Sequence, residues 1–169
     1  MLRLVIAAGL CLYLSLSSFA QLKKFYTIKE TCSFDTVNFT LKASSGNSFI
    51  KNYSESSYPM VILGNPDLER INPSFNTKFK GKTCFAKLDL EAYNSLNFGD
   101  GFAFVVAKKN QENDGNYWKI LVNQDKVYQF NMNYGVGNTE VDLSNVKTDK
   151  LKLKTGSANV KIGYQDDMK

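Results

Sequence analysis

The apolar residues of this chain recur at every second position, and this pattern restricts the possible folds more than any other feature. Val37, Phe39 and Leu41 alternate with polar residues, so one face of the segment is apolar and the other is wet. No window shows a sustained helical period, and the best helical candidate is a single turn at 90–96. The sequence therefore predicts an all-β protein with at most one short helical turn beyond its first twenty residues.

Residues that favour turns divide the chain into short predicted strands. Asparagine and the 11 glycines adopt turn conformations that other residues resist. Between them, the alternation predicts strands at 37–41, 48–52, 60–63, 84–90, 101–107, 117–122, 127–132, 139–143, 150–155 and 159–164. Asn-Pro pairs at 65–66 and 72–73 predict a loop between residues 63 and 75, because proline does not fit a central strand.

The first twenty residues have the pattern of an export signal. A positive start at Arg3 precedes an apolar run of about 13 residues, fewer than the roughly 20 that a helix needs to cross a bilayer. Ser18 and Ala20 are the small residues that a signal peptidase reads. The sequence predicts a signal peptide at 1–20 and a single β-repeat domain at 21–169, with an uncleaved anchor as the alternative. The expected location is the periplasm, the outer-membrane surface or the extracellular space.

Two cysteines, Cys32 and Cys84, remain after the predicted cleavage removes Cys11. Two cysteines in an exported chain most simply form one disulfide, and two buried thiols are the alternative. Neither residue lies in a CxxC motif, which disfavours redox catalysis and a zinc site.

The composition excludes several kinds of chemistry. Without histidine the chain has no Ser-His-Asp or Cys-His nucleophile and no imidazole metal ligand. The formal charge of +5 comes from 21 basic and 16 acidic residues that are spread too evenly for a nucleic-acid surface. Paired carboxylates remain, but Glu140 and Asp142 are expected on the wet face of a strand. We therefore predict no catalytic residues, no metal site, no cofactor and no nucleic-acid partner.

One set of aromatic residues could form a surface that stacks on sugars, because flat rings suit the apolar faces of sugars. The set consists of Tyr53, Tyr58, Tyr117, Trp118 and Tyr128. Aromatic residues in β proteins more often pack in the core or pair across strands, and both interpretations stay open.

A basic stripe is predicted near the C-terminus, where Lys150, Lys152 and Lys154 alternate with leucines. Such a stripe can bind anionic lipid or wall polymer. It can also be a solvated sheet face that keeps edges from pairing.

An internal repeat lies in the same region. Residues 137–143 (GNTEVDL) align with residues 156–162 (GSANVKI), 19 positions further on, and a weaker copy at 41–50 aligns with 153–162. Each unit is predicted as strand, Gly/Ser/Asn turn and strand. A period near 20 is typical of stacked β-rungs, and the chance recurrence of hairpins is the alternative.

The residues of this repeat resemble the bacterial toast-rack domains, over 134–164 and more weakly over 32–50. Those domains occur in cell-wall-active-antibiotic-response proteins and in exported chains catalogued as "putative adhesins". The resemblance implies a solenoid-like, open stack of β-rungs without a catalytic motif or cofactor. Family members usually continue for several more rungs, so the resemblance also implies a domain truncated at Lys169.

The sequence as a whole predicts an exported, non-enzymatic β protein of the cell envelope, acting as an adhesin or a surface structural module. The alternatives are a secreted carbohydrate-binding module and an envelope-stress sensing module with a membrane partner. The expected partners are a cell-envelope component, a surface glycan or another protein chain. Because no further copy follows 156–162, we also expect self-association through this C-terminal rung.

Overall fold

A computed structural model of the chain describes residues 24–29, 33–54, 56–66, 71–91, 97–98, 102–103 and 117–164. The strands are β1 (Lys24–Thr27), β2 (Thr36–Asn52), β3 (Met60–Asn65), β4 (Ser74–Lys80), β5 (Thr83–Leu90), β6 (Asn97–Phe98), β7 (Phe102–Ala103), β8 (Tyr117–Val122), β9 (Val127–Asp142) and β10 (Thr148–Gly163). Within these ranges there is no helix, and so none that could span a membrane. The predicted all-β class is confirmed. The predicted signal peptide and most of the predicted helical turn lie outside the described residues.

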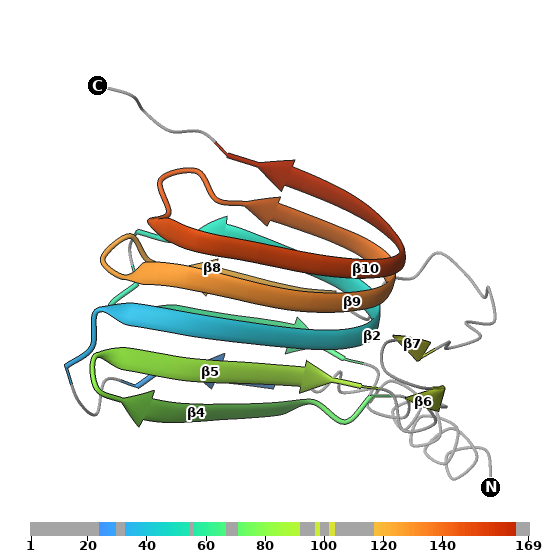
Figure 1. Cartoon of the computed structure of the whole chain (residues 1–169), viewed down its shortest axis with the longest axis horizontal. Helices are drawn as coiled ribbons and strands as arrows, with labels where there is room; N and C mark the ends of the chain where they lie inside the picture. Colours follow the sequence, from blue (N-terminus) through green and yellow to red (C-terminus); the bar gives the residue numbers. More distant parts are fainter. Residues whose placement is uncertain are drawn as a thin grey trace, which may run out of the picture.

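Eight of the strands form one mixed sheet (Figure 1). Strand β2 runs parallel to β5, β8 and β9, and β9 runs parallel to β10. Strands β1, β3 and β4 add antiparallel neighbours at the other end of the sheet. The three long strands cross the front layer of Figure 1, bend, and return across the back layer. The sheet therefore folds over itself into a barrel-like shape that is nearly closed, with the core between the two layers.

The long strands correct the prediction of separate short strands. Residues 37–41 and 48–52 both belong to β2, residues 127–132 and 139–143 overlap β9, and the last two predicted strands lie largely in β10. The Gly/Ser/Asn segments between them are bends inside continuous strands and not hairpin turns. Gly46 and Gly137 stand at these bends with φ of 117° and 131°, a region that side chains with a Cβ rarely occupy.

The bends are stacked too closely for a side chain. A Cβ on Gly137 would lie 2.0 Å from the Gly46 carbonyl oxygen, and a Cβ on Gly135 would lie 2.3 Å from the Ser44 carbonyl oxygen. Beside the bends, the Ser48 and Thr139 hydroxyls are 2.8 Å apart in a buried hydrogen bond. Small residues therefore occur here because two backbones touch.

The register of β10 corrects one of the two repeat alignments. Leu41 pairs with Met132 and Met132 pairs with Leu153, so the alignment of 41–50 with 153–162 is confirmed. Gly137 pairs with Ala158 and not with Gly156, so the alignment of 137–143 with 156–162 is wrong by two residues. Both spacings place an apolar residue of β10 opposite Val141, Val160 at a spacing of 19 and Ile162 at the observed spacing of 21, so the alternation of apolar residues alone did not distinguish them.

Core packing differs between the two ends of the sheet. Inward side chains of β2, β5, β8 and β9 are almost completely buried. At the end formed by β1 and β4, aromatic rings close the core: the centroids of Tyr26 and Phe75 lie 5.5 Å apart, as do those of Phe34 and Phe79.

Strands β2, β9 and β10 stack in parallel as expected for rungs. The antiparallel strands make the whole sheet mixed, unlike the uniform open solenoid that was expected.

Candidate binding surfaces

The two outer faces of the folded sheet differ in character. The outer face of the front layer is largely polar, although Phe85 is 42% exposed on it, and amides form a ladder across it. The Asn38 amide donates to Gln129 Oε1 over 3.1 Å, and the Gln129 amide donates to Asp149 Oδ2 over 2.7 Å. Such a face is well solvated and offers little apolar area to a partner.

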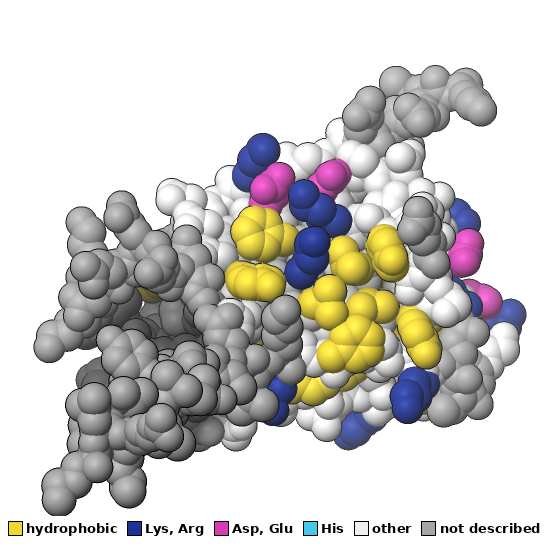
Figure 2. Space-filling view, turned by 180° about the vertical axis from the view of Figure 1, so that it is seen from behind, with side chains coloured by type: hydrophobic (Ala, Val, Ile, Leu, Met, Phe, Trp, Pro, Cys, Tyr) yellow, Lys and Arg dark blue, Asp and Glu magenta, His cyan; other side chains and the backbone are white. Residues whose placement is uncertain are grey.

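The outer face of the back layer is apolar at its centre, and lysines lie among its apolar side chains (Figure 2). Strand alternation places the buried residues of β8 inward and the others outward. We define the apolar outer face by six outward residues: Phe25, Phe49, Leu63, Tyr117, Lys119 and Leu121.

Pairing across the strands makes this apolar outer face continuous. Phe25 pairs with Leu63, Leu63 with Lys119, and Lys119 with Phe49. The Phe25 side chain is 61% exposed. Exposed apolar side chains that form one patch, with charges around them, are typical of a surface that contacts a partner.

At the β10 margin of this face, a shallow hollow of about 240 Å³ lies over β2, β9 and β10. Its lining includes Phe49, Glu140 and Lys161, and the Lys161 ammonium lies 3.4 Å from a Glu140 carboxylate oxygen. This pair is exposed, so it contributes little to stability. The hollow offers an apolar ring and two opposite charges, which suits binding more than proton transfer.

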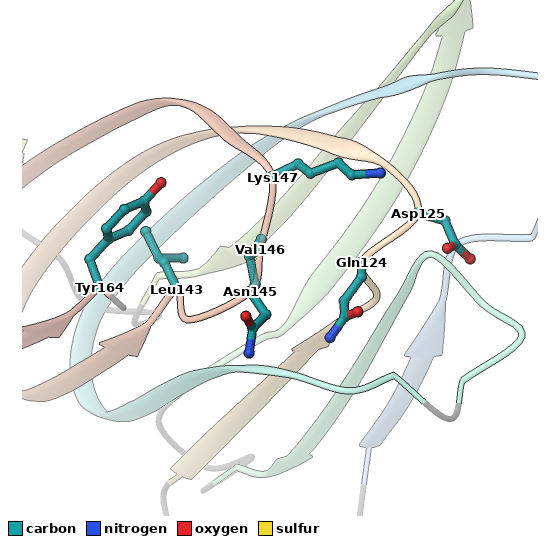
Figure 3. A pocket seen from close by; sticks show the side chains of 7 residues that line it. All are labelled: Gln124, Asp125, Leu143, Asn145, Val146, Lys147 and Tyr164. Atoms are coloured by element: carbon teal, nitrogen blue, oxygen red, sulfur yellow. The ribbon is translucent and has the colours of Figure 1, made fainter. Parts of the chain in front are cut away.

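A larger hollow of about 390 Å³ lies where the chain connects β8 to β9 and β9 to β10 (Figure 3). It is lined by Gln124, Asp125, Leu143, Asn145, Val146, Lys147 and Tyr164. The lining holds one carboxylate and one ammonium group. Among the residues that the structure describes, this lining holds no facing pair of carboxylates, which glycoside hydrolysis requires.

The predicted sugar-stacking set is divided by the structure. Trp118 is 1% exposed and Tyr128 is 0% exposed, so neither offers a face to a ligand. Gly64 makes room for the Trp118 ring, which would lie 2.4 Å from a Cβ at that position. The Tyr128 hydroxyl donates to the Pro59 carbonyl oxygen over 2.5 Å. The alternation along each strand could have predicted that both residues are buried. Trp118 lies two positions from the buried Ile120, and Tyr128 lies two positions from the buried Phe130.

The other three members of the set, Tyr53, Tyr58 and Tyr117, are exposed. Tyr53 and Tyr58 flank one short connection between β2 and β3. Tyr117 begins β8 and pairs with Asn47. Because Asn47 precedes Tyr53 by six residues of extended chain, Tyr117 lies about 20 Å from Tyr53 along the strand direction. The three tyrosines do not form one platform.

Of the two carboxylates considered from the sequence, Glu140 forms an ion pair with Lys161. Hydrogen bonds from the Ser144 side chain and backbone N–H lower the pKa of Asp142. In the described ranges, no group of three or more His, Cys, Asp or Glu residues could hold a metal ion.

The predicted disulfide stays a prediction. Cys84 is buried on the core side of β5. Cys32 lies outside the described residues.

The fold defines an all-β domain built on one curled, mixed sheet. The family model described as the N-terminal domain of toast_rack, DUF2154, matches residues 36–169, beginning at the first residue of β2. The chain therefore belongs to this toast-rack family, which confirms the resemblance seen in its repeat.

Solved structures of two bacterial proteins are among those similar to the chain, and no curated protein sequence matches it. One is a "putative cell adhesion protein" from Clostridium sporogenes, with a TM-score of 0.62 and 15% identity over 81% of this chain and 58% of that one. The other is a "putative adhesin" from Bacteroides fragilis, with a TM-score of 0.36 and 18% identity over 85% of this chain and 55% of that one. This chain spans little more than half the length of each.

Proposed function

We propose that this protein is an exported, non-enzymatic component of the bacterial cell envelope, acting as an adhesin or a surface structural module. The observation that carries the proposal is the apolar outer face, where Phe25 is exposed beside Leu63 and Lys119. The Clostridium sporogenes protein of similar fold, described as a "putative cell adhesion protein", supports it. In this proposal, function resides on a sheet surface and not in an enclosed cleft.

The partner proposed for the apolar outer face is a cell-envelope component. Lys119 lies in the middle of the face, and Lys51 is exposed on the neighbouring strand. Phosphate-bearing wall polymers and lipid headgroups are anionic, so lysines among apolar groups suit them. The parallel run of β2, β9 and β10 would form part of a longer solenoid-like stack that presents this face.

Cosedimentation with isolated membranes and isolated cell walls tests the proposal. A Phe25→Ser, Lys119→Glu variant should lose about fivefold or more of the bound fraction. The matched control is Asn76→Ser, Lys78→Glu, because both residues are exposed on the opposite, polar face. Equal binding of both variants, or no binding of the unaltered protein to either fraction, would contradict the proposal.

The location also needs a direct test. N-terminal mass analysis of protein recovered from outside the cytoplasm should give Gln21 as the first residue, because Ser18 and Ala20 fit the expected cleavage site. Recovery of a chain that still begins at Met1 would argue for an anchor.

A carbohydrate-binding module is the second candidate, and one observation favours it. Tyr53 and Tyr58 are both exposed on the connection between β2 and β3, where two rings could hold a sugar face. Binding on a glycan array that a Tyr53→Ala, Tyr58→Ala variant loses would support this function. A Tyr117→Ala variant is the control, since that ring lies at the other end of β8.

A further inference from the structure

Three asparagines line up across the outer face of the back layer, one on each of the three long strands just after the bend. Asn47 of β2 pairs with Asn138 of β9, which pairs with Asn159 of β10. The Asn138 amide donates to Asn47 Oδ1 over 2.9 Å, and the Asn159 amide donates to Asn138 Oδ1 over 3.1 Å. We call these three residues the amide row. Because neighbouring strands lie about 4.8 Å apart, the row presents one amide at each such step.

The amide row is held in place by its own hydrogen bonds and still has capacity for more. An asparagine side chain has two N–H donors and a carbonyl oxygen with two lone pairs. Among the described residues, the Asn138 side chain uses one donor on Asn47 and one lone pair on Asn159. Asn138 and Asn159 are exposed, so this capacity is open to a ligand. Groups that are already oriented lose little conformational entropy when a ligand binds.

A second row lies beside the amide row, two residues further along each strand. It consists of Phe49, Glu140 and Lys161, which pair in that order across β2, β9 and β10. The hollow of about 240 Å³ is lined by these three residues and by Asn138 and Asn159. The half-buried Phe49 ring supplies an apolar surface, the carboxylate supplies acceptors and the ammonium group supplies donors.

The chemistry of the two rows indicates the class of ligand. Glu140 repels anionic groups and balances the charge of Lys161, 3.4 Å away. An apolar ligand would cover the amides without replacing their hydrogen bonds to water, which opposes binding. Sugars carry hydroxyl groups at their edges and have apolar ring faces, so they suit amides beside an aromatic ring. Because the strand spacing is close to the length of one sugar unit, successive sugars would meet successive amides.

The hollow is suited to an acetamido group in particular. Such a group has a methyl, an N–H donor and a carbonyl acceptor. The methyl fits the Phe49 ring, the N–H fits the Glu140 carboxylate, and the carbonyl oxygen fits the Lys161 ammonium group. A hydroxyl group in the same place would leave the ring without a partner.

We propose that the amide row and this hollow form a binding site for an extended, uncharged chain of N-acetylated sugars. The chain lies across β2, β9 and β10, its hydroxyl groups exchange hydrogen bonds with the amide row, and one acetamido group enters the hollow. This proposal rests on the proposed function, because it names one class of cell-envelope component. The site adjoins the apolar outer face and shares Phe49 with it.

Isothermal titration calorimetry on the full chain tests the site with two soluble oligosaccharides. The probe is the β-1,4-linked hexamer of N-acetylglucosamine. The matched comparison is the β-1,4-linked hexamer of glucose, which has a hydroxyl group in place of each acetamido group. The probe should bind about tenfold more tightly, because the acetamido group fills the hollow and uses its polar groups. Equal affinities, or no binding of the probe, would overturn the proposal.

Two variants assign the binding to the two rows. Asn138→Ala removes the middle amide and should weaken binding of the probe about fivefold or more. Its matched control is Asn131→Ala, the same change at an exposed position of the same strand on the opposite outer face, and circular dichroism checks that both variants fold. Glu140→Ala should reduce the preference for the probe over the glucose hexamer. Equal binding by the two asparagine variants, or an unchanged preference in Glu140→Ala, would contradict the proposed site.

Three outcomes separate this site from the functions proposed above. A Tyr53→Ala, Tyr58→Ala variant should bind the probe as the unaltered protein does, and loss of binding would overturn the site in favour of those two rings. Cosedimentation with cell walls without any binding of the probe would overturn this proposal and leave the proposed function standing. Binding of the probe that depends on Asn138, in a protein that cosediments with neither membranes nor walls, would support the sugar site and contradict the proposed function.

Discussion

The Tyr134 hydroxyl donates a hydrogen bond to the Gly46 carbonyl oxygen, 2.5 Å away on the neighbouring strand. The same hydroxyl lies 3.2 Å from the Asn138 carbonyl oxygen. One phenol therefore connects the bend of β2 with the bend of β9. Because a bend leaves carbonyl groups outside the regular ladder, a buried side-chain donor at this point satisfies acceptors that would otherwise lack a partner.

A Tyr134→Phe variant should lose about 1 kcal/mol of unfolding free energy, because the part-buried Gly46 carbonyl oxygen would lose its donor. Urea denaturation measures the loss. Tyr117→Phe is the control, since that ring is exposed, and it should change stability little. Equal effects of the two substitutions would show that the hydroxyl of Tyr134 does not hold the bends.

Alkaline pH should destabilise the protein through its buried tyrosines. Burial raises the pKa of Tyr134 to about 12, although a hydrogen bond with Ser48 opposes the shift, and burial also raises the pKa of Tyr128. Below pH 10 both the folded and the unfolded chain keep these protons. Above about pH 10 the unfolded chain loses them first, so stability falls as pH rises from about 10 to 12, by roughly 1.4 kcal/mol per pH unit for each tyrosine.

Unfolding by urea across this pH range measures the effect. The Tyr134→Phe variant should show a shallower loss than the unaltered protein, because it has one fewer buried phenol. A stability that stays constant between pH 10 and 12 would contradict the burial of these groups.

A Gly137→Ala variant should lose about 3 kcal/mol or more, because strained backbone and a Cβ clash combine. The new Cβ would lie 2.0 Å from the Gly46 carbonyl oxygen, and φ at this position is 131°. Gly81→Ala is the control: Gly81 also has a positive φ, but nothing lies within 4 Å of its added Cβ. Thermal unfolding should rank Gly137→Ala well below Gly81→Ala, and a similar midpoint for both would argue against close stacking of the bends.

A Gly64→Ala variant should destabilise the core by about 1–3 kcal/mol through overpacking. Its Cβ would lie 2.4 Å from the Trp118 ring. Because Trp118 is the one tryptophan of the chain, its fluorescence reports the change directly. Gly163→Ala is the control, with its nearest neighbour at an ordinary 3.7 Å, and it should leave both stability and the spectrum unchanged.

A Cys32–Cys84 disulfide is expected in exported protein. The N–H of Asp35 donates to the Lys82 carbonyl oxygen over 3.0 Å, so the chain just after Cys32 runs beside the start of β5. Mass analysis under non-reducing conditions should find a peptide that contains both cysteines. Detection of two alkylatable thiols in denatured, unreduced protein would show that no bond forms.

The alternation of apolar residues was sufficient to predict the class of the fold and most strand positions. It placed Val37, Phe39 and Leu41 on one buried face, and it bounded β8 at 117–122 as observed. It missed β4, where Phe75 and Phe79 are only partly buried and the other side chains are exposed. An edge strand with so little buried surface carries a weak alternation.

The bends and the candidate surfaces were harder to predict. A Gly/Ser/Asn segment has the same composition whether the chain reverses in a hairpin or continues around a bend, and only the neighbouring backbone at Gly46 and Gly137 distinguishes the two. The apolar outer face brings together Phe25, Phe49 and Leu63 from three strands. Their adjacency depends on strand order, which one sequence does not contain. Burial of Trp118 was predictable from its phase with Ile120.

The position of β2 in the sheet determines when the domain can fold. Its pairing with β9 joins residues 91 positions apart, from Thr36 with Val127 to Ile50 with Val141. Closing such a long loop costs conformational entropy before any contact forms, and topologies rich in distant pairings fold slowly. During synthesis, β2 emerges early but gains this neighbour only when the last third of the chain has appeared. Assembly therefore waits for the late strands, and the apolar side of β2 stays exposed to chaperones and proteases until β9 arrives.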